Sequence, residues 1–332
     1  MTDGGDGARS TIEGVSHTVR SPDDWEDDSE RRYAERQARL AEHCGVDVES
    51  RIVETGSAGR VHYLVAGDPD GQPVVLLHGV GTHAATWLPM APALADGYRL
   101  YVPDRPGRGL SAAPGYGGRD LRTFLVDYLV ELFDGLGLDR PHVVGNSLGG
   151  LQAFLLAIDH DRVDRLCLVG APGGLSREFP VVFRLLTMHG VSRLLFWLNG
   201  RGDPLENARE SVGQFVVDDS ETSDAFYETL AAAQNLPGRT ESLRSLNLEQ
   251  GSFGRMHPLF DISEEVEGID RPTCFLWGEA DAFWPPEAGR PVAERMADAT
   301  FHALPDHGHM PWLEPGEETE RRVRSFLDGQ VE

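Results

Sequence analysis

Short apolar runs recur along the chain and predict β-strands. They are rich in Val, Ile, Leu and aromatic residues and are bounded by Gly, Pro and Asp, which is typical of strands between turns. The first two runs, residues 51–54 and 61–65, flank the turn at 56–59 and predict a hairpin. Six further runs predict six more strands: residues 73–77, 98–102, 141–145, 164–169, 272–277 and 300–304.

Between these runs the apolar positions follow helical spacing instead. The clearest case is residues 121–132, where the apolar positions are Leu121, Phe124, Leu125, Tyr128, Leu129 and Leu132. Strands that alternate with helices form a mostly parallel sheet with helices on both faces. The chain is therefore predicted to have an α/β fold around an eight-stranded sheet.

The alternation is interrupted between residues 172 and 268. This stretch has few strand signals and several apolar helical segments, especially residues 179–198. It separates the sixth predicted strand from the seventh. We therefore expect a helical insertion between a first core part, residues 51–171, and a second, residues 269–330.

The first 50 residues form an acidic N-terminal extension, with 13 acidic residues against six arginines. Residues 1–21 are expected to be disordered, and residues 22–44 to form an acidic helix that packs only lightly on the core. The candidate packing positions within that helix are Trp25, Tyr33, Leu40 and Ala41.

A serine motif lies where a strand is predicted to turn into a helix. The sequence Gly145-Asn146-Ser147-Leu148-Gly149-Gly150 follows the apolar run 141–144 and precedes the helix-forming run 151–156. A serine in a strained turn needs neighbours without a Cβ so that strand and helix can approach each other. The helix also directs its N-terminal amides toward the serine oxygen.

Further motifs follow other predicted strands. Residues 74–77 run into the loop His78-Gly79-Val80-Gly81, whose backbone can offer an N–H group to an oxyanion. Residues 273–278 lead to the carboxylates of Glu279-Ala280-Asp281, and residues 300–304 lead to Asp306-His307-Gly308-His309. The order serine, acid, histidine differs from that of chymotrypsin-like and subtilisin-like enzymes.

Over roughly residues 50–328 these motifs, with the turn Pro103-Asp104-Arg105-Pro106-Gly107-Arg108-Gly109-Leu110-Ser111, resemble the α/β-hydrolase superfamily. The resemblance implies the α/β-hydrolase fold, with residues 172–268 as a helical cap. Ser147 would be the nucleophile, His309 its base and Asp281 the group that orients the imidazole.

The base and the orienting carboxylate each have a rival two residues away. His307 competes with His309, and Glu279 competes with Asp281. The superfamily's Gly-His and Gly-x-x-Asp spacings match His309 and Asp281. A serine at the elbow argues against haloalkane dehalogenases and epoxide hydrolases of this fold, which use aspartate there.

The oxyanion hole is expected from the backbone N–H groups of Leu148 and Val80, with Gly81 as the alternate second donor. His78 is expected to shape that loop through hydrogen bonds rather than act as a second base. Asp104 is expected to stabilise a turn.

The elbow Gly-Asn-Ser-x-Gly-Gly and the stretch from Trp277 to Pro285 also resemble the meta-cleavage-product hydrolases, which cut carbon–carbon bonds. The chain departs from them in the 78–84 loop and at Met310, where those enzymes carry an aromatic residue. We therefore expect a serine hydrolase of carboxylic-ester type. The alternatives are a carbon–carbon hydrolase and a non-catalytic binding module on the same fold.

Two groups of side chains in and near the predicted cap have two interpretations each. Arg184 and Arg193 can bind a substrate carboxylate or extend to the acidic surface. Apolar side chains can line an acyl or aryl pocket or form plain core: Phe183, Phe196, Trp197 and Trp284.

The charge balance is strongly acidic: 54 Asp and Glu stand against 30 basic residues, net −24, and the chain contains no lysine. Such a surface repels nucleic acid and anionic membranes, so neither is an expected partner. The composition resembles that of proteins from salt-accumulating halophiles. The alternative is the codon preference of a GC-rich genome.

The remaining features set the expected location and partners. No apolar run of about 18 residues predicts a membrane span, and the acidic N-terminus does not resemble a secretory signal. Cys44, Cys167 and Cys274 are scattered and predict neither disulfides nor a metal site. We expect a cytoplasmic enzyme that needs no cofactor or metal and acts on a small-molecule acyl substrate. The sequence is compatible with a homo-oligomer.

Overall fold

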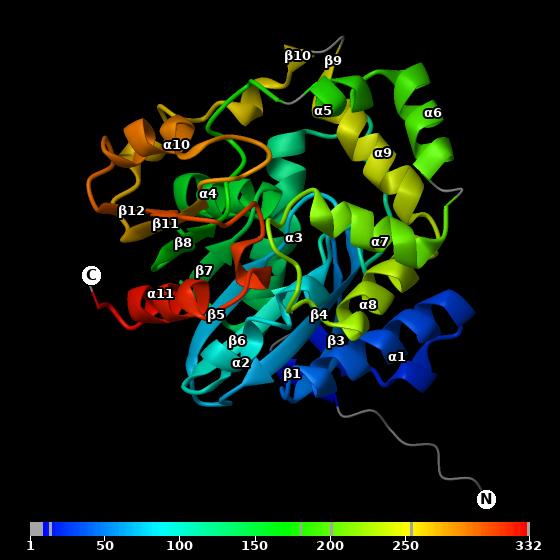
Figure 1. Cartoon of the computed structure of the whole chain (residues 1–332). Coiled ribbons are helices and arrows are strands. Elements are labelled where there is room, and N and C mark those ends of the chain that lie inside the picture. Colours follow the sequence, from blue (N-terminus) through cyan, green and yellow to red (C-terminus); the bar gives the residue numbers. More distant parts are fainter. Residues whose placement is uncertain (1–8, 13–14, 180, 200–201, 253–254, 331–332) are drawn as a thin grey trace, which may run out of the picture.

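The computed structural model describes residues 9–12, 15–179, 181–199, 202–252 and 255–330. Within them, ten strands form one sheet in the order β1-β2-β3-β4-β6-β5-β7-β8-β11-β12 (Figure 1). The strands are β1 Arg9–Ile12, β2 Val15–Val19, β3 Val48–Thr55, β4 Gly59–Gly67, β5 Gln72–Leu77, β6 Tyr98–Pro103, β7 His142–Gly145, β8 Leu166–Val169, β11 Thr273–Gly278 and β12 Ala299–Leu304. The pairs from β1 to β6 are antiparallel, and those from β6 through β5 to β12 are parallel.

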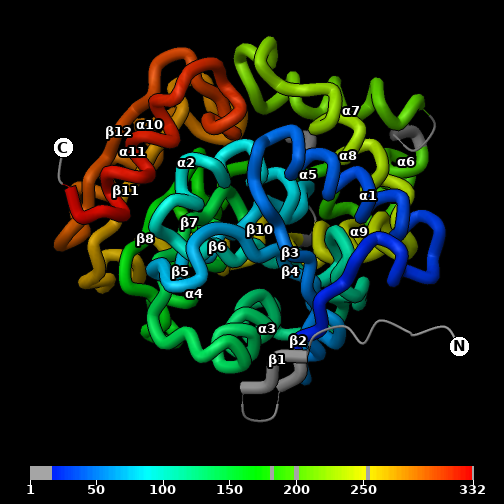
Figure 2. Tube along the Cα trace, turned by 90° about the horizontal axis from the view of Figure 1, so that it is seen from below, coloured from blue at the N-terminus to red at the C-terminus, as the bar shows by residue number. Residues whose placement is uncertain are grey.

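The eight strands predicted from the apolar runs are all present, as β3 to β8, β11 and β12. Their side chains alternate between two apolar layers because successive residues of a strand point to opposite faces. On β5, Val75 and Leu77 pack with residues of α3 and α4, whereas Val74 and Leu76 pack with residues of α2 and α11. Figure 2 shows α3 and α4 on one side of the strands and α2 and α11 on the other.

The helices of the core occupy both faces of this sheet, as the alternating pattern predicts. The face of α3 and α4 also carries α10, and α1 contributes Leu40 and Ala41 to the opposite layer. The core helices are α1 Asp28–His43, α2 Ala91–Ala95, α3 Leu121–Leu136, α4 Leu148–His160, α10 Pro286–Ala293 and α11 Glu318–Leu327.

The segment between β8 and β11, which we call the insertion (residues 172–268), contains five α-helices and one small hairpin within its described residues. Figure 1 shows α5, α6, α7 and α9 together beside the sheet, with α8 next to α1. The elements of the insertion are α5 Val181–Leu186, α6 His189–Asn199, α7 Pro204–Gly213, α8 Asp224–Gln234, α9 Arg239–Glu249, β9 Gly251–Ser252 and β10 Arg255–Met256.

The N-terminal extension is more ordered than the sequence suggested. We expected disorder over residues 1–21, but β1 and β2 extend the sheet, and Val19 pairs with Arg51 of β3. His17 explains the attachment: it is buried and its ring nitrogens contact Tyr63 Oη at 2.7 Å and the Gly135 carbonyl at 3.0 Å. That expectation was wrong for β1 and β2. Residues 1–8 and 13–14 lie outside the described residues.

The helix that follows the two strands, α1, is predicted correctly but packs more tightly than expected. The four candidate packing positions are all buried, although only three of them lie in α1 and Trp25 precedes it: Trp25, Tyr33, Leu40 and Ala41. Tyr33 is fully buried, with its hydroxyl 2.8 Å from Nδ1 of His83. Glu30 pairs with Arg60 of β4 at 2.6 Å and contacts Arg239 of α9 at 3.4 Å. The extension therefore contacts both the sheet and the insertion.

Candidate active site

Ser147 lies at a sharp turn between β7 and α4. Its φ of 53° and ψ of −118° are strained for a residue with a side chain. A Cβ on Gly149 would lie 2.1 Å from the carbonyl oxygen of Leu77, so only glycine allows α4 to approach β5 this closely. The strand, the strained serine and the helix follow one another as the sequence predicts.

Asp281 and His309 form a buried hydrogen-bonded pair. Nδ1 of His309 lies 2.7 Å from Oδ2 of Asp281. The carboxylate also accepts the N–H groups of Ala171 and Phe283, each at 2.9 Å. Burial would raise the pKa of Asp281, but His309 and these two amides outweigh burial and hold the pKa below its usual value. A charged carboxylate is therefore directed at the imidazole.

The two rival residues lie outside this pair. Glu279 is exposed on the surface after β11. His307 is partly exposed, and its Nδ1 lies 2.6 Å from the carbonyl oxygen of Pro305. The structure thus brings Asp281 and His309 together and leaves Glu279 and His307 apart from them.

Asn146 joins the serine turn to the histidine loop. Its side-chain amide is buried and donates hydrogen bonds to the carbonyl oxygens of His309, at 2.9 Å, and Val169, at 2.7 Å. The residue before Ser147 therefore fixes the backbone of the histidine. The sequence motif contained Asn146 but gave it no role, because a contact to a residue 163 positions away leaves no local pattern.

Residues 78–82, which we call the oxyanion loop, lie against the serine. A Cβ on Gly79 would lie 2.9 Å from Oδ1 of Asn146 and 3.3 Å from Cβ of Ser147. The loop carries Val80 and Gly81, the two alternatives for one oxyanion donor. Leu148, the expected first donor, begins α4, where the backbone N–H groups have no partner within the helix.

His78 shapes this loop through both of its ring nitrogens. Nε2 accepts the backbone N–H of Arg105 at 3.0 Å, so the ring proton is on Nδ1, which donates to the Gly79 carbonyl at 2.8 Å. Burial, followed by the charge of Arg105, lowers the pKa of His78 to about 3. His78 is therefore a neutral structural residue, as the sequence indicated.

Asp104 stabilises the turn after β6, as predicted. Its carboxylate accepts the N–H groups of Ala84 at 2.7 Å and Leu110 at 2.9 Å, and it contacts Nδ1 of His62 at 2.7 Å. Burial would raise the pKa of Asp104, but the pairing with His62, chiefly its hydrogen bond, lowers it.

With this geometry established, sequence comparison assigns the chain to a family. The model of the alpha/beta hydrolase family matches residues 74–322, which is most of the chain. The chain belongs to the alpha/beta hydrolase family.

Two relatives of this hydrolase are named for substrates. The chain is 31% identical over 277 residues to a 2-hydroxy-6-oxo-6-phenylhexa-2,4-dienoate hydrolase of Burkholderia cepacia, covering 81% of this chain and 91% of the relative. It is 32% identical over 284 residues to a 2-hydroxy-6-oxononadienedioate/2-hydroxy-6-oxononatrienedioate hydrolase of Burkholderia vietnamiensis, covering 83% and 93%.

Solved structures of two kinds resemble the hydrolase. A meta-cleavage product hydrolase from Pseudomonas fluorescens has a TM-score of 0.66 at 26% identity, covering 82% of this chain and 95% of that one. A carboxylesterase from Bacillus subtilis has a TM-score of 0.72 at 22% identity, covering 92% and 100%. At that identity the second likeness concerns the fold alone.

In this hydrolase an aromatic cluster packs around the imidazole of His309. The ring of Phe283 lies 4.3 Å from that of His309, and Phe215 stacks on Phe283 at 5.6 Å. Phe183 of α5 lies 4.7 Å from Phe283, and Trp284 follows at 5.6 Å. Phe183 and Trp284 thus belong to the surroundings of the site. Sequence reasoning gave no role to Phe215, which lies between α7 and α8 without a motif.

The insertion is bound directly to the histidine loop through Phe215 and Glu314. The carbonyl oxygen of Phe215 accepts the N–H of His309 at 2.7 Å. The buried carboxylate of Glu314 accepts the N–H groups of Gly308 at 2.9 Å, Val217 at 2.7 Å and Asp218 at 2.8 Å. These contacts hold residues 215–218 of the insertion on the loop that carries His309.

The other cap side chains singled out from the sequence have different surroundings. Arg184 donates from Nε to the carbonyl of Phe179 at 2.9 Å, beside the aromatic cluster. Arg193, Phe196 and Trp197 line an outer hollow of about 630 Å³ between α6 and α9. Trp197 is 52% exposed, so this group belongs to the outside of the insertion.

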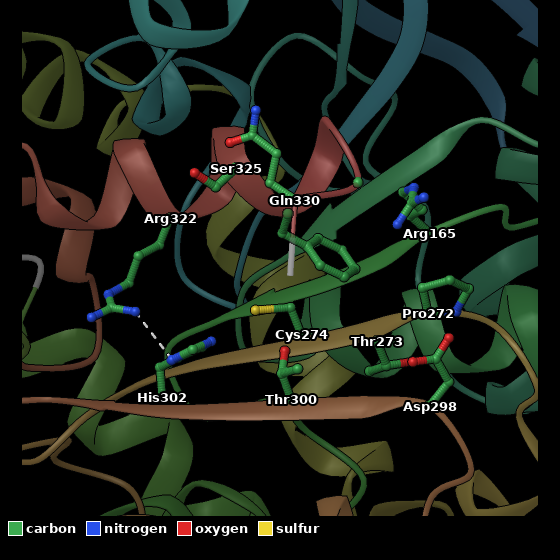
Figure 3. A pocket seen from close by; sticks show the side chains of 12 residues that line it. Arg165, Pro272, Thr273, Cys274, Asp298, Thr300, His302, Arg322, Ser325 and Gln330 are labelled. Carbon is green, nitrogen blue, oxygen red and sulfur yellow. Dashed lines mark hydrogen bonds between the residues drawn. The ribbon is translucent and has the colours of Figure 1, made fainter. Parts of the chain in front are cut away.

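A second hollow, of about 220 Å³, lies beside the N-terminal parts of β11 and β12 (Figure 3). These strands run parallel to β7, and Ser147 follows the C-terminal end of β7, so the hollow is at the opposite end of the sheet from Ser147. It is lined by the first residues of β11 and by α11, and Arg322 contacts His302 within it at 3.1 Å. Cys274 faces it and pairs in register with Cys167 of β8; both thiols are buried and free, as the strand pattern predicted.

The residues that the structure describes contain neither a metal-binding cluster nor a membrane-spanning helix. Among those residues, no three His, Cys, Asp or Glu side chains are grouped so that they could hold a metal ion. None of the described helices combines the length and apolar character needed to cross a membrane.

Proposed function

We propose that this chain is a serine hydrolase in which Ser147, His309 and Asp281 transfer an acyl group to water. The observation that carries the proposal is the buried Asp281–His309 pair, 2.7 Å between Oδ2 and Nδ1, in a loop tied by Asn146 to the strained turn of Ser147. An activated serine needs an adjacent base, and the base needs a group that orients it.

The reaction follows from these positions. Because Nδ1 of His309 is bound to Asp281, Nε2 is the nitrogen that takes the proton of Ser147 as its Oγ attacks a carbonyl carbon. The N–H groups of Leu148 and of Val80 or Gly81 stabilise the oxyanion. His309 then protonates the leaving group, and a water molecule activated in the same way releases the acid and restores Ser147.

For the substrate we propose a carbon–carbon bond next to a ketone, in a dienoate of the kind that names the two Burkholderia relatives. The aromatic cluster of Phe183, Phe215 and Phe283 around His309 suits a flat, apolar acyl group. The leaving group in this reaction is a carbon that must be stabilised by conjugation and protonated.

A carboxylic ester remains the second candidate. Two departures from the meta-cleavage-product hydrolases favour it: the oxyanion loop reads His78-Gly79-Val80-Gly81, and Met310 replaces an aromatic residue after the histidine. An ester leaving group is an alkoxide, which requires only a proton from His309.

A substrate panel separates the two candidates. Purified enzyme and its Ser147→Ala variant would be assayed in multimolar KCl with p-nitrophenyl esters of graded chain length and with a 6-phenyl dienoate ring-fission product. We expect the dienoate to give the higher kcat/KM and the variant to be inactive on both. A preference for the esters by tenfold or more would assign the enzyme to ester hydrolysis.

A further inference from the structure

In the oxyanion loop the carbonyl groups of residues 79–82 are each bound by a side chain. Gly79 O accepts from Nδ1 of His78 at 2.8 Å, and Val80 O accepts from Nη2 of Arg105 at 2.7 Å. Arg108 donates to the next two carbonyls, to Gly81 O and, at 3.0 Å, to Thr82 O. Because the C=O and N–H of a trans peptide point in opposite directions, fixing these carbonyls also fixes the N–H groups of the loop.

Arg105 makes this contact from inside the protein. Its residue is 2% exposed, and its Nη1 donates to the hydroxyl of Tyr116 at 2.8 Å, which in turn donates to the Pro106 carbonyl at 2.7 Å. Among the ion pairs of the described residues none includes Arg105, and its neighbour Asp104 is paired with His62. A buried guanidinium without a carboxylate partner is unfavourable for folding alone.

The guanidinium of Arg105 and the ring of His78 bind different peptide groups of the oxyanion loop. The peptide group whose oxygen Arg105 binds ends in the N–H of Gly81, and the peptide whose oxygen His78 binds ends in the N–H of Val80. A charge-assisted hydrogen bond to a carbonyl polarises its peptide and makes the attached N–H a stronger donor. The bond from Arg105 is charge-assisted, whereas the bond from the neutral His78 is not.

We propose that Arg105 is a positioning residue that fixes and polarises the Val80–Gly81 peptide for oxyanion binding. The inference rests on the proposed acyl transfer at Ser147. It assigns the second oxyanion donor to Gly81 in preference to Val80. It also requires the planar guanidinium, because a single group must hold Val80 O and Tyr116 Oη at the same time.

Three variants test the role. Arg105→Met should lower kcat about 100-fold, the usual effect of losing an oxyanion donor, and leave KM within about threefold. Arg105→Lys keeps the charge but not the two-point contact, and should lower kcat about tenfold. Arg239→Met is the matched control. Arg239 is also a buried arginine, but it binds the Gly109 carbonyl at 2.8 Å and not the loop, so kcat should stay within about twofold.

The deciding readout is inhibition by a trifluoromethyl ketone, which forms a tetrahedral adduct with the serine. Its Ki should rise in parallel with the fall in kcat across the Arg105 variants, whereas a merely structural role would leave Ki and kcat uncorrelated. Wild-type kcat in folded Arg105→Met would overturn the proposal. If that variant does not fold, wild-type kcat and Ki in Arg105→Lys would overturn it.

Different results would contradict the proposed acyl transfer at Ser147 and the proposed role of Arg105. If the wild-type enzyme does not turn over any ester or dienoate and does not label at Ser147 with a fluorophosphonate, the acyl transfer itself is wrong. If the wild type turns over and labels but the Arg105 variants match it, only the role of Arg105 is wrong.

Discussion

The part of the chain that the structure describes contains two buried carboxylate–imidazole pairs of nearly the same geometry. In each, Nδ1 of the histidine lies 2.7 Å from Oδ2 of the aspartate: His309 with Asp281, and His62 with Asp104. Each carboxylate also accepts two backbone N–H groups. His62 even has a serine at its other nitrogen, with Ser50 Oγ at 2.9 Å from Nε2.

The two pairs differ in the serine that accompanies them. Ser50 lies within the regular strand β3, where its residue pairs with Leu64 of β4 and its carbonyl accepts the N–H of Arg20 at 2.8 Å. Ser147 has a strained backbone at the start of a helix and lies against the oxyanion loop. We therefore expect that a hydrogen-bonded Ser–His–Asp series alone does not make a serine a nucleophile. The nucleophile also needs donors where the oxyanion forms.

Replacing the two serines should give the largest contrast. We expect Ser147→Ala to lower kcat by roughly four to six orders of magnitude, since only the oxyanion hole and binding remain. Ser50→Ala should keep kcat within about twofold. Steady-state kinetics and fluorophosphonate labelling measure both, and labelling of Ser147→Ala at the wild-type rate would identify another nucleophile.

Replacing the histidines should show which imidazole acts as the base. His309→Ala should lose about as much activity as Ser147→Ala, because the serine then has no base. His307→Ala should retain most activity, since that ring contacts the Pro305 carbonyl and not Asp281. The same assays apply, and an inactive His307→Ala beside an active His309→Ala would transfer the role.

Replacing one aspartate should lower mainly the activity, and replacing the other should lower mainly the stability. Asp281→Asn should lower kcat by about 10⁴-fold or somewhat less, because the imidazole loses its tautomer control. Asp104→Asn breaks a fully buried pair and should cost about 3–5 kcal/mol of unfolding free energy while catalysis per folded molecule changes little. Urea unfolding and kcat on the same samples test this. A fully active Asp281→Asn would point to Glu279.

Lowering the pH should destabilise the protein through His83, a buried histidine near Asp104. Burial lowers the pKa of nearby His83 to about 4, well below its unfolded value of about 6.5. The unfolded chain then binds the proton first, so stability is complete above about pH 6.5 and declines as the pH falls toward 4. Thermal melts should show this decline, and His83→Gln should make it shallower. Equal slopes would assign the decline to other groups.

Salt should have little effect on the two buried pairs, because it mainly screens the repulsion between charges on the surface. With a net charge of −24, the melting temperature should rise from 0.1 M to above 2 M KCl as the Debye length shrinks from about 10 Å to below 3 Å. Asp104→Asn should show the same rise, since a buried pair is screened little. A flat melting temperature would leave the missing lysines as a codon preference.

The sequence predicted the parts of the molecule that have a local pattern. The eight strands were visible as apolar runs, and the turn at Ser147 as glycines around a serine. The strands β1 and β2 are short and polar, and their attachment depends on His17 reaching Tyr63 and Gly135. Asn146 and Glu314 act through backbone groups of distant segments. Such contacts have no periodicity and become visible only in three dimensions.

The carbonyl of Phe215 has a consequence for how substrate enters. Because it accepts the N–H of His309, lifting residues 215–218 away would also release the loop that carries the base. Opening the insertion at residues 215–218 would therefore disturb the position of the proposed base, His309. We therefore expect substrate to enter elsewhere along the insertion, where four apolar side chains of α5, of α6 and of the turn between them are exposed: Leu185, Met188, Leu194 and Trp197. We thus expect substrate to enter through a different part of the insertion from the part that holds the His309 loop in place.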